Sequence, residues 1–225
     1  AVDRLRAAGV GLHPASPVAN LVAEEGRWRL VPRGGREGAR ARYDHVVIAT
    51  DAHAAARLAA GVDPAAAGRL EVYRFAPIAT AYLAWRGNVP LPEAVMLDED
   101  RSRGEPGQWL FDRGRQEGLR IAAVVVSARD RLADLDAVAL GDACAGQACR
   151  QLGLPPPDGV RVLTEHRATW RCTPDRPRLA IDALAAAAPG VWLAGDYLET
   201  DYPATLESAV RSGRRVGERI GSLVS

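Results

Sequence analysis

The chain has 225 residues, of which 48% are apolar and 25% are charged, and its formal net charge at pH 7 is +1. This length allows one large domain or two small ones around a substantial core. The balanced charge argues against a nucleic-acid partner. Three cysteines form neither a C-x-x-C pair nor a disulfide framework, which fits a reducing, cytoplasmic compartment.

The first forty residues predict a helix end followed by a hairpin. Residues 2–8 read as the end of an amphipathic helix that Gly9 stops. No Met opens the chain and it begins in mid-helix, so we expect that the first part of a longer protein is absent. Residues 16–22 are extended, and residues 28–31 are the return strand after a Glu-Glu-Gly turn.

A second segment predicts a strand–turn–helix unit. The β-branched, apolar run over residues 43–50 is typical of a buried parallel strand. Asp51 can act as the N-cap of an alanine-rich helix over residues 52–60. This order of elements indicates an α/β layer.

The middle of the chain predicts an inserted sheet. Strands are expected over residues 75–85, 95–97, 108–111, 119–127 and 160–170, and a helix over residues 135–152. Residues 1–70 and 176–225 then form one α/β domain, and residues 71–175 form a mixed sheet with a helix, inserted into it. The fold class is therefore α/β.

The C-terminal stretch predicts a ligand site. A short buried strand over residues 191–194 leads into Gly195-Asp196 and then into a helix over residues 204–220. A helix N-terminus offers N–H groups and a positive dipole end, Gly195 allows close backbone approach, and Asp196 can accept from ligand hydroxyls. Leu206, Val210, Gly213, either Val216 or Gly217, and Ile220 predict the helix face that packs on the sheet.

The same stretch resembles a known flavin signature. Residues 193–196 and 202–213 are similar to the C-terminal motif of the FAD-dependent amine oxidase and phytoene desaturase superfamily. Within it, residues 76–83, 107–114 and 165–174 resemble the squalene-associated desaturase-like family, the hydroxysqualene dehydroxylases of hopanoid synthesis. The likeness covers nearly the whole chain, but only about the C-terminal half of a family member.

This resemblance implies a fold and a cofactor. The chain is expected to be the C-terminal part of a FAD-binding Rossmann-like domain with an inserted mixed-sheet substrate domain. The resemblance implies FAD contacts at Val18, Ala49, Thr50, Gly195, Asp196, Pro203, Thr205 and Leu206. From the residues alone, Val18 is a plain strand valine, Asp196 can simply cap its turn, and Asp51 can be an ordinary N-cap. The family's G-x-G-x-x-G motif does not occur in these 225 residues.

The resemblance also implies substrate and catalytic residues. Gln108, Trp109 and Phe111 are expected to line an apolar channel for an isoprenoid, although aromatic residues at a spacing of two are often plain core. Asp112, His166 and Arg167 are the candidates for catalysis, because the loss of an allylic hydroxyl needs an acid. The alternative for all three is a surface ion-pair role.

Taken together, the resemblance predicts a FAD-dependent oxidoreductase that reduces hydroxysqualene to squalene. The alternatives are another flavoenzyme of the superfamily, such as a carotenoid desaturase or an amine oxidase, and a truncated, non-catalytic product. The expected partners are an apolar isoprenoid substrate, a missing N-terminal FAD-binding segment and, because the substrate is so apolar, a membrane surface.

Overall fold

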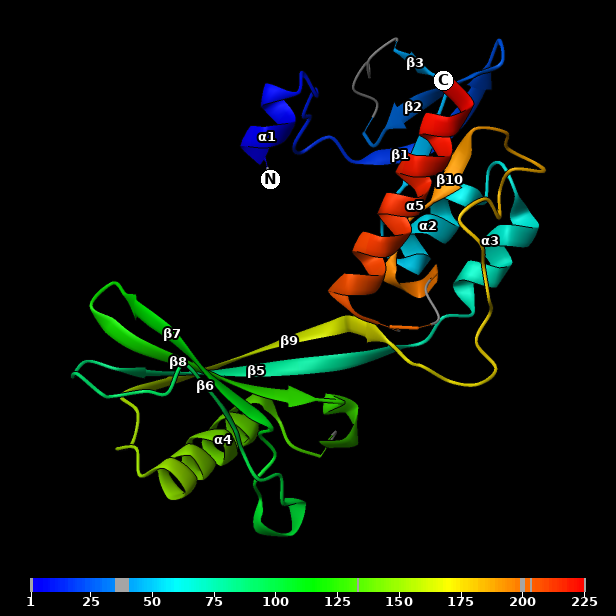
Figure 1. The fold of residues 1–225 in the computed structure, drawn as a ribbon. Coiled ribbons are helices and arrows are strands. Elements are labelled where there is room, and N and C mark those ends of the chain that lie inside the picture. The colour runs from blue at the N-terminus through cyan, green and yellow to red at the C-terminus, as the bar shows by residue number, and fades with distance from the viewer. Residues whose placement is uncertain (1, 35–40, 133, 199–200, 203, 225) are drawn as a thin grey trace. The chain divides into compact units, whose positions relative to one another are not determined.

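The computed structural model describes residues 2–34, 41–132, 134–198, 201–202 and 204–224 (Figure 1). The chain forms two compact units. We call Ala1–Tyr73 with Cys172–Ser225 the outer unit, and Arg74–Arg171 the inserted unit. The boundaries predicted from the sequence were 70/71 and 175/176.

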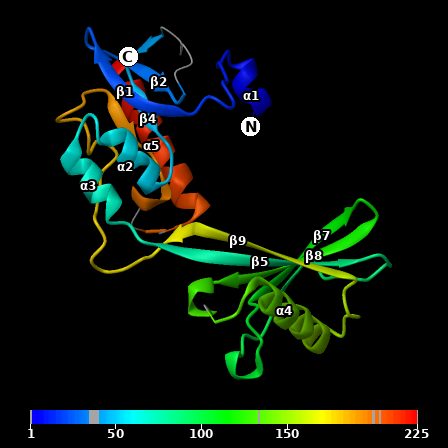
Figure 2. The same cartoon turned by 180° about the vertical axis from the view of Figure 1, so that it is seen from behind.

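Within the described residues, the outer unit contains two small sheets and four α-helices (Figures 1 and 2). The strands are β1 (Val18–Glu24), β2 (Arg27–Pro32), β3 (Arg42–Tyr43), β4 (Val46–Ile48) and β10 (Val191–Leu193). The helices are α1 (Val2–Ala7), α2 (Ala52–Ala59), α3 (Pro64–Glu71) and α5 (Leu206–Val224), with the short 3₁₀ helix η3 (Asp196–Leu198). The order β1-β2-β3 is antiparallel, whereas β4 pairs with β10 in parallel.

Local sequence accounts for these elements. The predicted hairpin is confirmed, and its turn places Glu25 and Gly26 at positive φ. Asp51 caps α2 by accepting from the Ala54 N–H at 3.0 Å. Helix α3 is not among the predicted elements, because its Ala/Gly-rich sequence lacks a clear apolar period.

Helix α5 packs through a face that only partly overlaps the predicted one. Its buried residues are Ser208, Ser212 and Val216, and Leu206 and Val210 are exposed instead. The serines can be buried because each hydroxyl donates to the carbonyl three residues earlier, at 2.7 and 2.8 Å. The predicted Val216 and Ile220 do pack against Trp192. The prediction followed residue polarity alone, so it wrongly included Leu206 and Val210 and missed the two serines.

The inserted unit, over its described residues, is one five-stranded sheet with a helix on one face. Its elements are β5 (Phe75–Trp85), β6 (Ala94–Met96), β7 (Trp109–Gln116), β8 (Leu119–Ser127), β9 (Gly159–Trp170), α4 (Ala137–Leu152) and two 3₁₀ turns, η1 (Arg101–Arg103) and η2 (Arg129–Leu132). The order is β6-β7-β8-β5-β9, and every pairing is antiparallel rather than mixed. Helix α4 connects β8 to β9, which lie on either side of β5.

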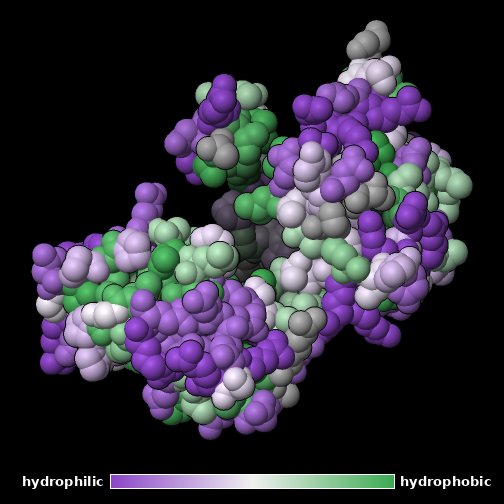
Figure 3. Space-filling view, turned by 60° about the horizontal axis from the view of Figure 1, so that its bottom comes forward, coloured by the Kyte–Doolittle hydropathy of each residue, from purple (hydrophilic) through white to green (hydrophobic). Residues whose placement is uncertain are grey.

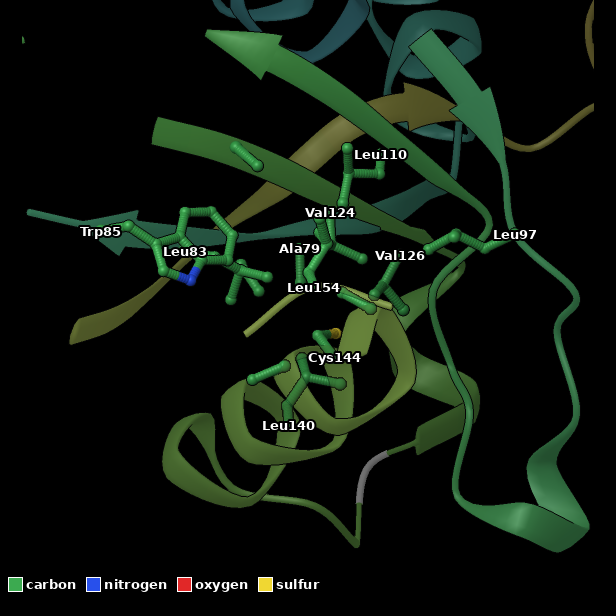
Figure 4. Close-up of a cluster of buried hydrophobic side chains, with 14 of the residues drawn as sticks. Ala79, Leu83, Trp85, Leu97, Leu110, Val124, Val126, Leu140, Cys144 and Leu154 are labelled. Carbon is green, nitrogen blue, oxygen red and sulfur yellow. The ribbon is translucent and has the colours of Figure 1, made fainter. Parts of the chain in front are cut away.

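The core of the inserted unit lies between this sheet and α4 (Figure 4). Leu83, Leu110 and Val124 come from three strands and meet Leu140 and Cys144 of the helix. All five are fully buried. Burial raises the pKa of the Cys144 thiol to about 12, so Cys144 is an apolar core residue and not a reactive one.

The surface mixes polar and apolar residues. In the view of Figure 3, hydrophilic side chains cover most of the visible face, with apolar residues between them. Among the described residues, no helix combines the length and the apolar character that crossing a membrane requires.

Candidate functional site

The carboxyl ends of the two parallel strands bring the predicted cofactor residues together. Leu193 pairs with Ile48, and the Ala194 N–H donates to the Ile48 carbonyl at 2.9 Å. Ala49-Thr50 and Gly195-Asp196 therefore leave the sheet side by side. This is the edge at which open parallel sheets bind ligands.

Gly195 lies against the ring of Tyr197. A Cβ at this position would lie 2.3 Å from Cε1 of the Tyr197 ring. The space beside Gly195 is thus filled by Tyr197 rather than left open for a ligand. The Gly195 N–H donates to the Ser212 hydroxyl at 2.9 Å, which fixes the turn to α5.

Two tyrosines are buried behind this turn. Tyr73 and Tyr197 pack edge to face with ring centroids 5.6 Å apart, and the Tyr73 hydroxyl donates to the Tyr197 carbonyl at 3.0 Å. Burial raises the pKa of both phenols, and the Asp196 carboxylate adds to each increase. The Tyr197 hydroxyl is buried without a hydrogen-bond partner among the described residues. An orphaned buried donor at a ligand edge is the kind of group that a ligand or a water satisfies.

The start of α5 is capped by its own residues. The Thr205 hydroxyl accepts from the Ser208 N–H at 3.2 Å and donates to the Tyr202 carbonyl at 2.8 Å. Leu206 follows with 88% of its surface exposed, which is unusual for leucine. Pro203, the remaining predicted residue of this group, lies outside the described residues.

A cavity of about 510 Å³ opens beside β4. Three of the predicted cofactor residues, Val18, Ala49 and Thr50, line it. Arg33 and Arg57 add two cations to a lining that is otherwise mostly apolar. A cavity of this size and polarity suits part of a nucleotide-sized ligand.

The sheet face of the inserted unit that α4 does not cover is apolar and partly exposed. Paired residues on neighbouring strands share a face, and this register sets one residue from each strand in a row: Met96, Trp109, Val125, Thr80 and Leu163. A second row contains Ala94, Phe111, Ala123, Tyr82 and Arg161. We call these ten residues the open face; it spans about 19 Å across the strands at ~4.8 Å per strand.

Trp109 and Phe111 lie side by side on the open face, as expected from their spacing of two. Their rings stack with centroids 5.8 Å apart, and 42% and 36% of their surfaces are exposed. Exposed, stacked aromatic rings are not core residues, so the plain-core alternative does not apply to them. Their role as substrate contacts remains a prediction.

Gln108 and Asp112 are engaged in holding the sheet. The Gln108 amide donates to Glu99 and accepts from the Ser127 N–H, each at 2.8 Å. Asp112 points to the face opposite Phe111, where it accepts from Arg120 at 2.6 Å and from the Gly114 N–H at 2.8 Å. The Asp112 geometry fits the ion-pair alternative.

His166 and Arg167 lie in a bulge of β9. Glu165 pairs with Ile78 and Thr169 with Ala76, so the residues between them oppose only Pro77. Proline has no N–H to donate to the ladder, which accounts for the bulge. Strands β8 and β5 separate these two residues from Asp112, so the structure does not bring the three predicted catalytic residues together.

The outer unit fits FAD in part. The cavity, the paired strand ends and the unpartnered Tyr197 hydroxyl suit a dinucleotide. The sequence patterns did not single out Tyr73, Tyr197 or, on the open face, Met96, Tyr82 and Leu163. The period-two pattern of residues 75–85 could have indicated Tyr82, but cross-strand partners are not readable from one sequence.

Solved structures share this fold. The cyclohexylamine oxidase of Brevibacterium oxydans superimposes with a TM-score of 0.63 at 16% identity, covering 92% of this chain and 48% of that one. A putrescine oxidase gives a TM-score of 0.61 at 14% identity over 92% and 48%. An oxidoreductase of Methanosarcina mazei gives 0.64 at 12% identity over 96% and 52%. At these identities the likeness shows the fold alone.

Two relatives match more closely in sequence. The hydroxysqualene dehydroxylase of Rhodopseudomonas palustris is 33% identical over 121 residues, 50% of this chain and 26% of the relative. That of Sinorhizobium fredii is 30% identical over 115 residues, 49% and 25% of the two chains. The match thus spans about a quarter of each relative. The profile of flavin-containing amine oxidoreductases matches residues 1–221, and the chain therefore belongs to this family of FAD-dependent oxidoreductases.

Proposed function

We propose that this protein is part of a FAD-dependent enzyme that removes the hydroxyl group of hydroxysqualene to give squalene, a step towards hopanoids. The observation that carries the proposal is the similarity to two proteins named hydroxysqualene dehydroxylase over about half of the chain. The open face, whose first row bears no charge, supports an apolar substrate.

FAD would lie at the carboxyl ends of β4 and β10. Val18 and Ala49 would border its adenosine part in the cavity, Asp196 would accept from ribityl hydroxyls, and the first turn of α5 would face the flavin ring. A further segment, outside these residues, would supply the glycine-rich contacts to the pyrophosphate.

The reaction exchanges a hydroxyl for hydrogen. The substrate's C–O bond breaks, the oxygen leaves as water after taking one proton, and a C–H bond forms with one hydride. Reduced flavin, when bound, supplies the hydride. In this proposal His166, exposed on the β9 bulge, donates the proton. Asp112 is less suited, since it is paired with Arg120 on the opposite face of the sheet.

The open face would hold the isoprenoid chain. Trp109, Phe111 and Leu163 offer apolar area, and Tyr82 sits in the second row next to them. A substrate of this kind partitions into lipid, so we place the enzyme in the cytoplasm at the membrane surface.

The test is production of squalene in cells. A bacterial host that makes hydroxysqualene would express the complete gene that encodes this chain, and its lipids would be analysed by mass spectrometry. We expect squalene to accumulate and hydroxysqualene to fall. Release of a carotenoid, or oxidation of amines by the purified flavoprotein, would instead support the related oxidase chemistries.

Variants tested in the same cells separate residues that bind the substrate from residues that bind flavin. Trp109→Ala should lower conversion at least tenfold while flavin absorbance is unchanged, whereas Asp196→Ala should lower flavin occupancy itself. The matched control is Val138→Ala, which truncates an exposed residue of α4 away from the open face and should change neither readout. Persisting hydroxysqualene in a flavin-loaded wild type would contradict the proposal.

A further inference from the structure

A long connection joins the two strands at one edge of the inserted sheet. Residues 97–108 run from β6 to β7, and two paired residues of the open face, Met96 and Trp109, stand directly before and after them. Strand β6 contains only three residues, so it can fix this edge through few ladder hydrogen bonds. The orientation of Trp109 therefore depends largely on what holds the connection.

Helix α4 holds this connection through a fully buried glutamine. The side-chain carbonyl of Gln147 accepts from the Gly107 N–H at 2.7 Å, and its amide N–H groups donate to the carbonyls of Asp98 and Gly107, each at 2.9 Å. A buried amide is costly unless its polar atoms are paired. Here the carbonyl and both N–H groups have partners, so Gln147 binds both ends of the connection at once.

A second glutamine, one helical turn further along α4, adds to this contact. The Gln151 side chain accepts from the Asp98 N–H at 3.0 Å, and it donates to the Asp98 carbonyl at 2.9 Å and to the Glu105 carboxylate at 3.0 Å. Arg150 donates to the same carboxylate at 2.8 Å. Glu105 is 3% exposed, and a buried carboxylate needs such partners. We call Gln147 and Gln151 the glutamine clamp.

The residues next to β7 are packed against the clamp and the core. A Cβ at Gly107 would lie 2.6 Å from Cγ1 of Val124 and 2.9 Å from the side-chain oxygen of Gln147, so only glycine fits there. The Gln108 carbonyl accepts from the Leu97 N–H at 2.9 Å, and the Leu97 side chain lies in the core (Figure 4). The position of β7 is thus set from the helix side of the sheet.

The stacked aromatic pair stands on the opposite face. Trp109 follows the clamped connection directly, and its ring lies 15° from parallel with that of Phe111, with centroids 5.8 Å apart. The contacts of the clamp draw the connection towards α4 and away from these rings. A displacement of β7 by the clamp would therefore move both rings together.

We infer that the glutamine clamp positions Trp109 and Phe111 for the substrate from the far side of the sheet. Its two side chains act through β7, whose register and angle they fix, so that the two rings form one apolar surface. The inference rests on the proposed function for the identity of the ligand, an isoprenoid chain. The effect of the clamp on the rings is independent of that ligand.

Fluorine NMR can follow the rings directly. Trp109 is 42% exposed, whereas the other four tryptophans of this chain are at most 6% exposed. In the complete flavin-loaded enzyme labelled with 5-fluorotryptophan, the Trp109 signal is the one that Trp109→Phe removes. We expect this signal to shift or split in Gln147→Met, which keeps the side-chain length without the hydrogen bonds, and in Gly107→Ala. Gln151→Met, at a half-buried residue, should give a smaller shift of the same kind.

Two controls separate positioning from stability. Leu140→Ala removes a fully buried side chain near the other end of α4 and destabilises the same unit, yet it should leave the Trp109 signal in place. Gln116→Met changes an exposed glutamine at the far end of β7 and should alter neither the signal nor the kinetics.

Steady-state kinetics with hydroxysqualene complete the test. We expect KM to rise at least fivefold in Gln147→Met while kcat stays within twofold, because the clamp serves binding and not the chemical step. A Trp109 signal that is unmoved in both Gln147→Met and Gly107→Ala would overturn the inference. An equal shift in Leu140→Ala, or a shifted signal with an unchanged KM, would overturn it as well. Failure of the flavin-loaded wild type to convert hydroxysqualene would instead contradict the proposed function, and the Trp109 shifts would then still decide whether the clamp positions the rings.

Discussion

The two units of this chain contain sheets of opposite character. The five-stranded sheet of the inserted unit has α4 packed on one face around Leu110 and Leu140, which are fully buried. The sheet formed by β4 and β10 has two strands over the described residues, and Val47 in its middle is exposed. A sheet of two strands rarely supports itself. The inserted unit therefore carries its own core, whereas the outer unit leaves surface for further contacts.

The largest effect should come from the core of the inserted unit. Leu110→Ala removes a fully buried side chain between β7 and α4 and should lower the free energy of unfolding of this unit by about 2–5 kcal/mol. Val47→Ala, in β4, should change stability by about 0.5 kcal/mol or less. Urea unfolding of both variants measures the contrast. Equal losses would show that the two sheets do not differ in this way.

A second effect should appear where the outer unit is tightly packed. Gly195→Ala would place a methyl group against the Tyr197 ring and should cost about 1–3 kcal/mol. If the ring is the cause, the cost should disappear in a background of Tyr197→Ala. A double-mutant cycle by thermal unfolding measures this coupling. If the cost persists without the ring, packing against Tyr197 is not its cause, and close approach of a ligand would better explain the glycine at this position.

A third test concerns the polar contact inside the inserted unit. Gln147 is fully buried, accepts from the Gly107 N–H at 2.7 Å, and donates to the carbonyls of Asp98 and Gly107 at 2.9 Å. Gln147→Leu would leave these backbone groups without their hydrogen-bond partner and should lower the free energy of unfolding by about 1–3 kcal/mol. Exposed Gln116→Leu is the control for the substitution itself. A neutral Gln147→Leu would show that the loop before β7 is satisfied by water.

The smallest effect should be a pH dependence of the same unit. Hydrogen bonds from Arg150 and Gln151 hold the pKa of the Glu105 carboxyl below its usual value of 4.5. A lowered folded pKa means that the stabilisation is present above pH 4.5 and is lost as the pH falls through the folded pKa. We therefore expect the free energy of unfolding, measured from about pH 6 downward, to fall more steeply with pH once the pH is below the usual carboxyl pKa. This fall should be smaller in Glu105→Gln. An identical slope in both proteins would remove Glu105 as the source.

The sequence predicted long, strongly patterned elements better than the packing between them. The strand over residues 75–85 and the strand over residues 119–127 are confirmed to the residue, because the alternation of the first and the apolar, β-branched run of the second are local signals. The face of α5 was predicted only in part: Val216 and Ile220 pack against Trp192, but Ser208 and Ser212 are buried through hydrogen bonds that their polarity conceals. Family membership and the flavin cofactor followed from motif residues near Gly195 and are confirmed.

Site geometry was harder to predict, since it depends on register. Pro77 was the one local indication of the bulge that contains His166 and Arg167. Nothing local to Gln108 indicated that Glu99 and Ser127 occupy its amide. Contacts between distant segments decide which side chains remain available for chemistry.

The insertion of one unit into the other also sets an order of events during folding. The Trp28 indole N–H donates to the Pro189 carbonyl, 161 residues further along the chain. Strand β4 likewise pairs with β10, which comes much later in the sequence. Closing so long a loop is slow, whereas the hairpin β7–β8 forms from nearby residues. During synthesis the inserted unit can therefore fold first and bring the two ends of the outer unit together, so that the β4–β10 pair is completed last.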